Sequence, residues 1–298
     1  MINSGPRTGK ANRFGRFLQR FAFCLSLACC LTALNGCDDG NNGAEDRTAE
    51  RENARLVVFA AASLTETLSE IGKSYESAHP GTKVVFNFDS SGTLKTQIAE
   101  GAVCDIFISA APKQMDQLDI GAGEARNPKK LDHVLSESRV NLLENKVVLA
   151  VSKSGSSELK SFDDLAAALK EHRVFLAIGN SDVPVGQYTL RIFDYYGINM
   201  DDLFAHKSLT LGSNVKEVTA QIREGVADAG IVYATDAYSA DLRIIDVATA
   251  EMAGQVVYPA AVLKNSKHRS QASEFLEYLK SGESKTVFES VGFIVIGR

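Results

Sequence analysis

Four short stretches of the chain combine small or hydroxyl side chains with the start of a helical pattern, which is chemistry suited to holding an anion. They are Ala61-Ala62-Ser63-Leu64-Thr65, Phe88-Asp89-Ser90-Ser91-Gly92-Thr93, Asp182-Val183-Pro184-Val185-Gly186-Gln187 and Gly212-Ser213-Asn214-Val215. A helix N-terminus carries partial positive charge and backbone N–H groups that have no partner within the helix. No Lys or Arg lies inside the first three stretches. We therefore expect an anion there to be held by neutral donors.

The same stretches have a simpler interpretation as ordinary helix starts. Ser and Thr are common N-caps, Gly and Pro are common in loops, and Pro184 fits the first turn of a helix. One junction of this kind does not indicate a ligand. Several in one chain favour a binding cleft, but they do not name what binds there.

Catalytic chemistry finds no support in the residue pattern. Ser63 and Ser91 are candidate nucleophiles, but neither lies in a Gly-x-Ser-x-Gly elbow. The histidines mostly stand among charged residues, are interpreted as surface positions and pair with no Ser; they are His79, His133, His172, His206 and His268. P-loop, dinucleotide-binding, His-Glu-x-x-His and Cys-x-x-Cys motifs are absent from the sequence. We expect a protein that is not an enzyme, with no cofactor and no site for a bare metal cation.

Strand-like and helix-like segments alternate from residue 55 onward and must position the four stretches. Predicted strands span 56–59, 83–88, 105–109, 146–152, 174–178, 229–233 and 256–262. Predicted helices span 64–77, 93–100, 161–169, 187–196, 215–224 and 271–280, the last being the final clear helix. The alternation predicts an α/β fold with mainly parallel sheets. Ligands of such sheets bind beyond the carboxyl ends of strands, where the first three stretches fall; the fourth has no clear strand before it.

The N-terminal segment has the features of a bacterial export signal. Residues 1–36 contain five basic residues and no acidic one, followed by an apolar run at 21–33 that is short for a membrane span. Leu34-Asn35-Gly36-Cys37 resembles a lipoprotein cleavage box, which implies cleavage before Cys37 and lipid on its thiol. An ordinary signal peptide with an incidental Cys is the alternative. Residues 37–54 are predicted to form a flexible acidic tether.

Charge and cysteine content narrow the possible partners of the processed chain. Loss of residues 1–36 changes the formal net charge from −5 to −10, because five basic residues and no acidic ones leave. A nucleic-acid partner is therefore not expected. If Cys37 carries lipid, Cys104 is the one remaining thiol, so no internal disulfide can form. We expect a monomer outside the cytoplasm that a lipid tethers to a membrane.

Taken together in order, the motifs resemble the periplasmic molybdate-binding proteins of ABC transporters, the ModA family. The resemblance rests on VFAAASLTE at 58–66, FDSSGTLKTQIAEGAVCDIFISA at 88–110, VPVGQY at 183–188, GIVYATDA at 230–237 and YPAAV at 258–262. It implies a type II periplasmic-binding-protein fold, in which two α/β lobes close on molybdate or tungstate. Its lobes would be 55–140 with 241–298 and, between them, 141–240. It also implies that the closed protein docks on an ABC permease.

The resemblance also implies a set of ligand-binding residues. Ser63 and Ser91 would each donate through the hydroxyl and the amide. Val185 and Val215 would donate through backbone amides, and Tyr233 through its phenol. Ala62 would line the same pocket.

Three residues affect how well the sequence fits the binding site of this family. Val185 stands where Ala is common, so the rim of the pocket would be tighter. Cys104 is interpreted as a packing residue. Asp89 is expected to point outward, because a carboxylate in the pocket would weaken anion binding.

Other functions remain open at this stage. The same fold could hold sulfate, phosphate or an organic anion, but those sites often use a buried Arg or Asp, and no junction supplies an Arg. A lipid-anchored hydrolase that uses Ser63 or Ser91 would need a nearby His. A ligand-sensing module without a role in transport is the last alternative.

Overall fold

The structure, a computed structural model, describes residues 54–155 and 158–297. The predicted signal peptide, Cys37 and the tether up to residue 53 lie outside the described residues. Among the described residues, no helix has the length and apolar character needed to cross a membrane.

Eleven strands and eleven α-helices are assigned in the described residues. The strands are β1 (Arg55–Ala61), β2 (Lys83–Asp89), β3 (Ile106–Ile108), β4 (Val140–Asn145), β5 (Val147–Val151), β6 (Leu176–Gly179), β7 (Leu209–Gly212), β8 (Ala229–Tyr233), β9 (Arg243–Val247), β10 (Val256–Val262) and β11 (Ile294–Val295). The helices are α2 (Thr65–Ala78), α3 (Ser91–Ala99), α4 (Pro112–Asp116), α5 (Phe162–Lys170), α6 (Pro184–Tyr196), α7 (Met200–Ala205), α8 (Val215–Arg223), α9 (Ala234–Ser239), α10 (Ala250–Ala253), α11 (Arg269–Tyr278) and α12 (Gly282–Ser290). Short 3₁₀ turns lie at Ala62–Leu64, Ile120–Ala122 and Ser136–Ser138.

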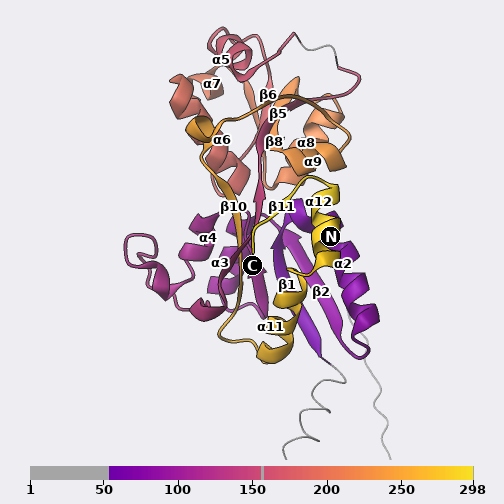
Figure 1. The fold of residues 1–298 in the computed structure, drawn as a ribbon. Coiled ribbons are helices and arrows are strands. Elements are labelled where there is room, and N and C mark those ends of the chain that lie inside the picture. Colours follow the sequence, from indigo (N-terminus) through magenta and orange to yellow (C-terminus); the bar gives the residue numbers. More distant parts are fainter. Residues whose placement is uncertain (1–53, 156–157, 298) are drawn as a thin grey trace, which may run out of the picture. The chain divides into compact units, whose positions relative to one another are not determined.

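The strands form two sheets, each the centre of one lobe. The first sheet has the order β11-β4-β10-β3-β1-β2, and the second has the order β7-β6-β8-β5-β9. Both ends of the described chain share the first lobe, which holds β1–β4, β10 and β11 and is drawn partly in indigo and yellow in Figure 1, and the segment between them forms the second lobe with β5–β9. The two-lobed α/β architecture predicted from the sequence is confirmed.

The prediction of mainly parallel sheets is only half right. β1 is parallel to β2 and β3, and β6 is parallel to β7 and β8. In contrast, β10 is antiparallel to β3 and β4, and β5 is antiparallel to β8 and β9. The antiparallel pairs arise where the chain passes between the lobes: Lys146 alone separates β4 of the first sheet from β5 of the second.

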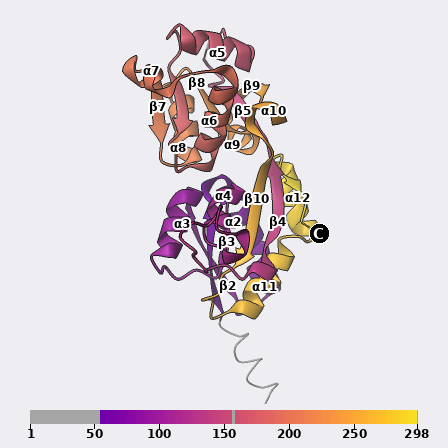
Figure 2. The same cartoon turned by 90° about the vertical axis from the view of Figure 1, so that its left-hand side faces the viewer.

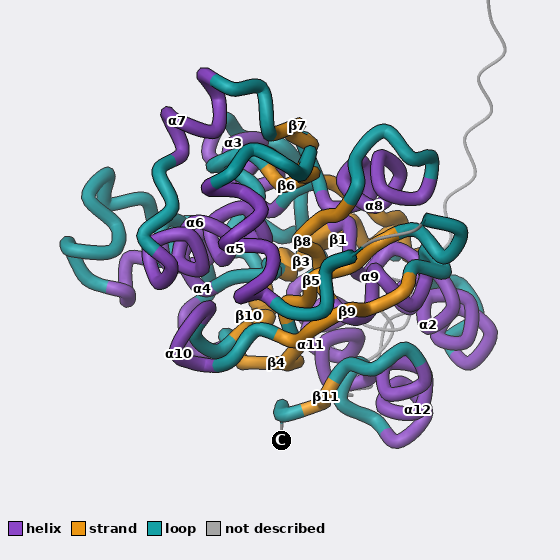
Figure 3. Tube along the Cα trace, turned by 90° about the horizontal axis from the view of Figure 1, so that it is seen from above, coloured by secondary structure: helices purple, strands orange, loops and turns teal. Residues whose placement is uncertain are grey.

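Helices cover both faces of each sheet because the central strands are apolar on both sides. β5, β8 and β10 are buried along their whole length, as is typical of strands enclosed by helices. α2 and α3 lie on opposite sides of the first sheet (Figures 1 and 2). α6 and α8 lie on opposite sides of the second sheet, as the view in Figure 3 shows. Both helices pack against β6 and β8.

The predicted strands and helices agree with the structure in position, but β4, β7, β9 and β11 are not among the predicted strands. β4 is six residues long, and its Leu142 and Leu143 are fully buried. β7 precedes the fourth junction, where the sequence shows no clear strand. It is a four-residue edge strand with little buried surface, so it lacks a clear apolar signal. α12 follows the helix predicted to be the last and is amphipathic only in part, with two buried residues, Ser284 and Phe288.

Candidate functional site

One small cavity between the two lobes brings together all six residues predicted for the pocket. It is lined by Ala61, Ala62, Ser63, Asp89, Ser90, Ser91, Ala110, Val183, Pro184, Val185, Val215 and Tyr233. The first lobe supplies the residues up to Ala110, and the second lobe supplies the rest. Four of the contributing segments are starts of helical turns, as the sequence predicts.

Ser63 and Ser91 form the wall from the first lobe, and neither hydroxyl serves as a helix cap. Ser63 lies in the 3₁₀ turn after β1, and its Oγ is 3.0 Å from the Tyr258 hydroxyl. Ser91 is the first residue of α3, whose cap is the neighbouring Ser90. The Ser91 Oγ accepts a hydrogen bond from the Ala110 N–H at 3.0 Å. Its own proton is therefore directed elsewhere and can be donated.

Two helix N-termini form most of the opposite wall. Val185 is the second residue of α6, and Val215 is the first residue of α8. Amide groups in a first helical turn have no acceptor within the helix, so both N–H groups are available to a ligand. The Asn214 side chain caps α8 by accepting a hydrogen bond from the Glu217 amide, so the cap does not use the Val215 amide. The β-branched Val185 side chain is fully buried and packs into the lobe.

Tyr233 carries a polar group that the protein leaves without a partner. It ends β8, its side chain is 1% exposed, and its hydroxyl oxygen makes no hydrogen bond to any described residue. Burial raises the pKa of the Tyr233 phenol well above its ordinary value. The phenol therefore stays protonated at neutral pH and can act as a donor. A buried hydroxyl without a partner is costly, which indicates a group that a ligand completes.

The cavity is narrow and almost uncharged. The space open to the centre of a water molecule is about 10 Å³, roughly one water position. Asp89 is the one charged side chain among the lining residues. Its Oδ1 accepts a hydrogen bond from the Ser90 amide at 2.6 Å, and its outward orientation stays a prediction. Helix N-termini on both walls still favour a negatively charged ligand.

A hydrogen-bonded chain behind Ser63 was not part of the predicted site. The Tyr258 hydroxyl contacts Ser63 Oγ and accepts from Asn145 Nδ2 at 3.3 Å. Asn145 Nδ2 also donates to Thr235 Oγ1 at 2.9 Å. This chain joins the end of β1, the crossing strands β4 and β10, and the start of α9. The YPAAV segment marked Tyr258 in the sequence, but nothing local indicated its partner.

A cation also lies beside the site without lining it. Lys216 follows Val215, and its Nζ is 3.1 Å from Asp236 Oδ1 and 2.7 Å from Glu66 Oε2. Burial raises the pKa of Asp236 to about 6, although Lys216 opposes that shift. Two carboxylates face the one ammonium group of Lys216, so this cluster carries a formal charge of −1 when all three groups are ionised.

The lobes touch directly next to the cavity. A Cβ atom placed on Gly92 would lie 2.3 Å from the backbone oxygen of Asp182, which precedes α6. No side chain fits there, so the backbones of α3 and of the loop before α6 meet only because residue 92 is Gly. Cys104 lies apart from the cavity lining, buried in the core beneath the first sheet.

Comparisons with known proteins agree with this fold. Residues 56–294 match the family described as bacterial extracellular solute-binding protein. The chain is 34% identical over 256 residues to a putative ABC transporter substrate-binding lipoprotein, YvgL, of Bacillus subtilis, covering 85% of this chain and 92% of that one. It is 34% identical over 245 residues to the molybdate-binding protein ModA of Haemophilus influenzae, covering 81% and 90%. Among solved structures, the periplasmic molybdate-binding protein of Azotobacter vinelandii has the same fold, with a TM-score of 0.67, 22% identity and coverage of 81% and 99%.

Two α/β lobes with a cavity between helix N-termini define a type II periplasmic binding protein. The chain belongs to the bacterial extracellular solute-binding protein family, in the group that contains the ModA proteins. YvgL is described as a putative substrate-binding protein of an ABC transporter and ModA as a molybdate-binding protein. The protein is, like them, a substrate-binding protein and not an enzyme. Members of the family act outside the cytoplasm.

Proposed function

We propose that the protein captures molybdate or tungstate from outside the cytoplasm and delivers it to an ABC permease. The observation that carries the proposal is the buried Tyr233 hydroxyl without a partner, which faces the first-lobe serines across a cavity walled by helix N-termini. The similarity to ModA proteins over most of the chain supports molybdate as the ligand. Tungstate is included because it has nearly the same size and charge.

Seven neutral donors would replace the hydration of the dianion. They are the hydroxyl and amide of Ser63, the hydroxyl and amide of Ser91, the amides of Val185 and Val215, and the Tyr233 phenol. A hydrogen bond to a charged group contributes about 1.5–3 kcal/mol. Donors on both lobes are needed together, so binding favours the closed arrangement of the lobes.

The dimensions of the cavity bear on selectivity. A tetrahedral oxyanion needs more room than one water position, so the residues that line the cavity must shift slightly as it binds between the closed lobes. The fixed positions of the donors then favour an anion whose bonds to oxygen have the matching length. Molybdate and tungstate have longer bonds to oxygen than sulfate, so they can be told from sulfate but hardly from each other.

A lipid on Cys37 would hold the protein at a membrane. The tether predicted for residues 37–54 would leave the two lobes free to meet the permease. The relative YvgL is described as a lipoprotein, which supports this part of the proposal.

Calorimetric titration of the full chain with molybdate, tungstate, sulfate and phosphate tests the ligand. We expect tight binding of molybdate and tungstate at one site, and weak or no binding of the other two. Clear binding of sulfate or phosphate with no binding of molybdate would overturn the proposal.

Two substitutions test the site. Ser63→Ala and Tyr233→Phe should each weaken binding by about 1–3 kcal/mol, because each removes a donor to a desolvated anion. Ser69→Ala on α2 and Tyr278→Phe on α11 are matched controls, since neither residue lines the cavity. Unchanged affinity in both site variants would show that these residues are not ligands.

A further inference from the structure

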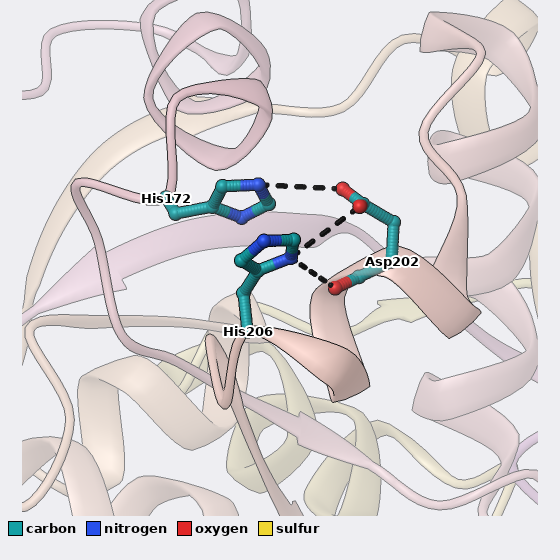
Figure 4. Close-up of side chains that lie close together, drawn as sticks. All are labelled: His172, Asp202 and His206. Carbon is teal, nitrogen blue, oxygen red and sulfur yellow. Dashed lines mark hydrogen bonds and ion pairs between the residues drawn. The ribbon is translucent and has the colours of Figure 1, made fainter.

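Two histidines and an aspartate meet on the surface of the second lobe, away from the cavity between the lobes. His172 lies in the loop after α5, Asp202 lies in α7, and His206 directly follows α7. Figure 4 shows both imidazole rings facing the Asp202 carboxylate from the same side. One potential ligand atom from each residue lies within 4.8 Å of the other two.

The distances match those between ligands of one metal ion. His172 Nε2 is 3.5 Å from Asp202 Oδ2, and His206 Nδ1 is 3.4 Å from Asp202 Oδ1. In a tetrahedral site with bonds of roughly 2.1 Å, neighbouring ligand atoms are about 3.4 Å apart. Each imidazole nitrogen therefore already stands at ligand spacing from one of the two carboxylate oxygens.

The fold holds these three side chains together. Asp202 and His206 are four residues apart, so they share one face of the helix. His172 has a left-handed backbone (φ 53°) and is fixed by its N–H bond to the Leu169 carbonyl at 3.1 Å. The two rings stack, with centroids 3.7 Å apart and an angle of 17° between their planes. The Ser208 hydroxyl lies 3.5 Å from His172 Nδ1. A metal bound at Nε2 of His172 would leave Nδ1 free for this contact.

Few changes separate this arrangement from a metal centre. The stacked rings must turn about their Cβ–Cγ bonds so that their lone pairs converge, a rotation with a broad energy profile. His206 Nδ1 also donates to the Asp202 carbonyl at 3.0 Å, so that bond must break and its proton must leave. All three side chains are partly exposed, with 27%, 48% and 51% of the side chain accessible for His172, Asp202 and His206. Solvent can accept the proton and supply further ligands.

The donor set selects the class of metal. Imidazole nitrogen suits zinc, copper, nickel and iron, whereas magnesium and calcium prefer oxygen ligands alone. Two imidazoles and one carboxylate form a common zinc set, with water in the fourth position. We propose that His172, Asp202 and His206 bind one divalent transition-metal ion, Zn²⁺ in the first instance. The ion would tie the loop after α5 to α7, and it is independent of the oxyanion.

Calorimetric titration of the full chain with Zn²⁺, without a polyhistidine tag, tests the proposal. We expect His172→Ala, Asp202→Asn and His206→Gln each to weaken one binding event by about tenfold or more, because each removes a direct ligand. Asp201→Asn is the matched control, since Asp201 is an exposed carboxylate next to Asp202 on the same helix. Comparison among variants is needed because cysteines outside the described residues can also bind zinc.

Cobalt gives a second readout. Co²⁺ in a site of two imidazoles and a carboxylate absorbs visible light far more strongly than aqueous Co²⁺, and Asp202→Asn should abolish that absorption while Asp201→Asn keeps it. Far-UV circular dichroism and molybdate titration should be unchanged in all variants, since the three residues are partly exposed and outside the cavity. Equal zinc affinity in the wild type and all three ligand variants would overturn the proposal, as would no zinc binding by the wild type at millimolar concentration.

Discussion

Lys216 of α8 contacts Glu66 of α2, with 2.7 Å between Nζ and Oε2, and so joins the second lobe to the first beside the cavity. The same ammonium group faces the buried Asp236 at 3.1 Å. The pKa of Lys216 is raised: burial alone would lower it, but Asp236 and Glu66 outweigh that effect. Glu66 and Lys216 lie on different lobes, so separation of the lobes would break this contact. It therefore contributes to closure without contributing a ligand.

Removal of the charge on Glu66 should weaken oxyanion binding slightly. Glu66 is about half exposed, and exposed ion pairs contribute about 0–1 kcal/mol. We expect Glu66→Gln to raise the Kd for molybdate by up to about fivefold at low salt, and by less at high salt, because salt screens the pair. Glu70→Gln, an exposed change on the same helix, is the control. If the two variants bind molybdate equally at every salt concentration, the ion pair has no part in closure.

Addition of a single methyl group at Gly92 should interfere with closure. The new Cβ would overlap the Asp182 carbonyl oxygen of the other lobe, and backbone on both sides cannot give way as a flexible side chain could. We expect Gly92→Ala to weaken molybdate binding by more than about tenfold, equivalent to 1.4 kcal/mol, while the fold stays intact.

Gly282→Ala is a matched control for that substitution. Gly282 also lies in the first turn of a helix, and a Cβ there meets no atom within 4 Å. Calorimetry gives the affinity, and small-angle X-ray scattering gives the opening of the lobes. Wild-type affinity in Gly92→Ala would show that the lobes do not approach this closely when the ligand is bound.

Tyr258 should act through Ser63. Its hydroxyl lies 3.0 Å from Ser63 Oγ but is not among the cavity lining. We expect Tyr258→Phe to weaken molybdate binding by about 1 kcal/mol, because it frees the Ser63 hydroxyl and leaves Asn145 with one acceptor fewer. In a double-mutant cycle with Ser63→Ala, the two changes should couple by about 0.5–3 kcal/mol. Additive effects would mean that Tyr258 does not position Ser63.

Asp236 should make the stability of the protein depend on pH in the acid range. Burial raises the pKa of Asp236 to about 6 in the folded protein, from an ordinary value of 3.8. The folded state then holds a proton that the unfolded state has lost, so this group contributes stability at low pH that disappears as the pH rises through about 6. Other titratable groups also make the free energy of unfolding depend on pH, so the contribution of Asp236 is measured as the difference between the wild type and a variant.

Asp236→Asn removes that proton-binding site. Between pH 4 and pH 7, the free energy of unfolding of the wild type should fall relative to the variant by up to about 3 kcal/mol, for a shift of roughly two pKa units. Urea unfolding at several pH values measures the difference. Parallel curves for the two proteins would show that Asp236 keeps an ordinary pKa.

Local patterns in the sequence were enough to predict most elements of the two lobes and the junctions that contribute to the candidate site. Apolar runs predicted the central strands, because strands such as β5 and β10 are buried on both faces and carry a strong signal. Small residues and Ser before helical patterns identified Ser63 and Ser91 at junctions. Val185 and Val215 also lie in junctions of this kind, but only the family resemblance assigned a role to their amides and added Tyr233, since a Val amide has no signature in sequence.

Tertiary structure decided everything that depends on residues far apart in the chain. The antiparallel direction of β10 and β5 follows from the path of the chain between the lobes, and β7 is a strand only because β6 pairs with it. Ser90 and Ser91 look alike in sequence, but only the position of α3 makes one a cap and directs the other to Ala110. Glu66 with Lys216, Gly92 with Asp182, and His172 with His206 meet only in the folded chain. Side-chain type and spacing act over a few residues, whereas these contacts are set by how strands and helices pack.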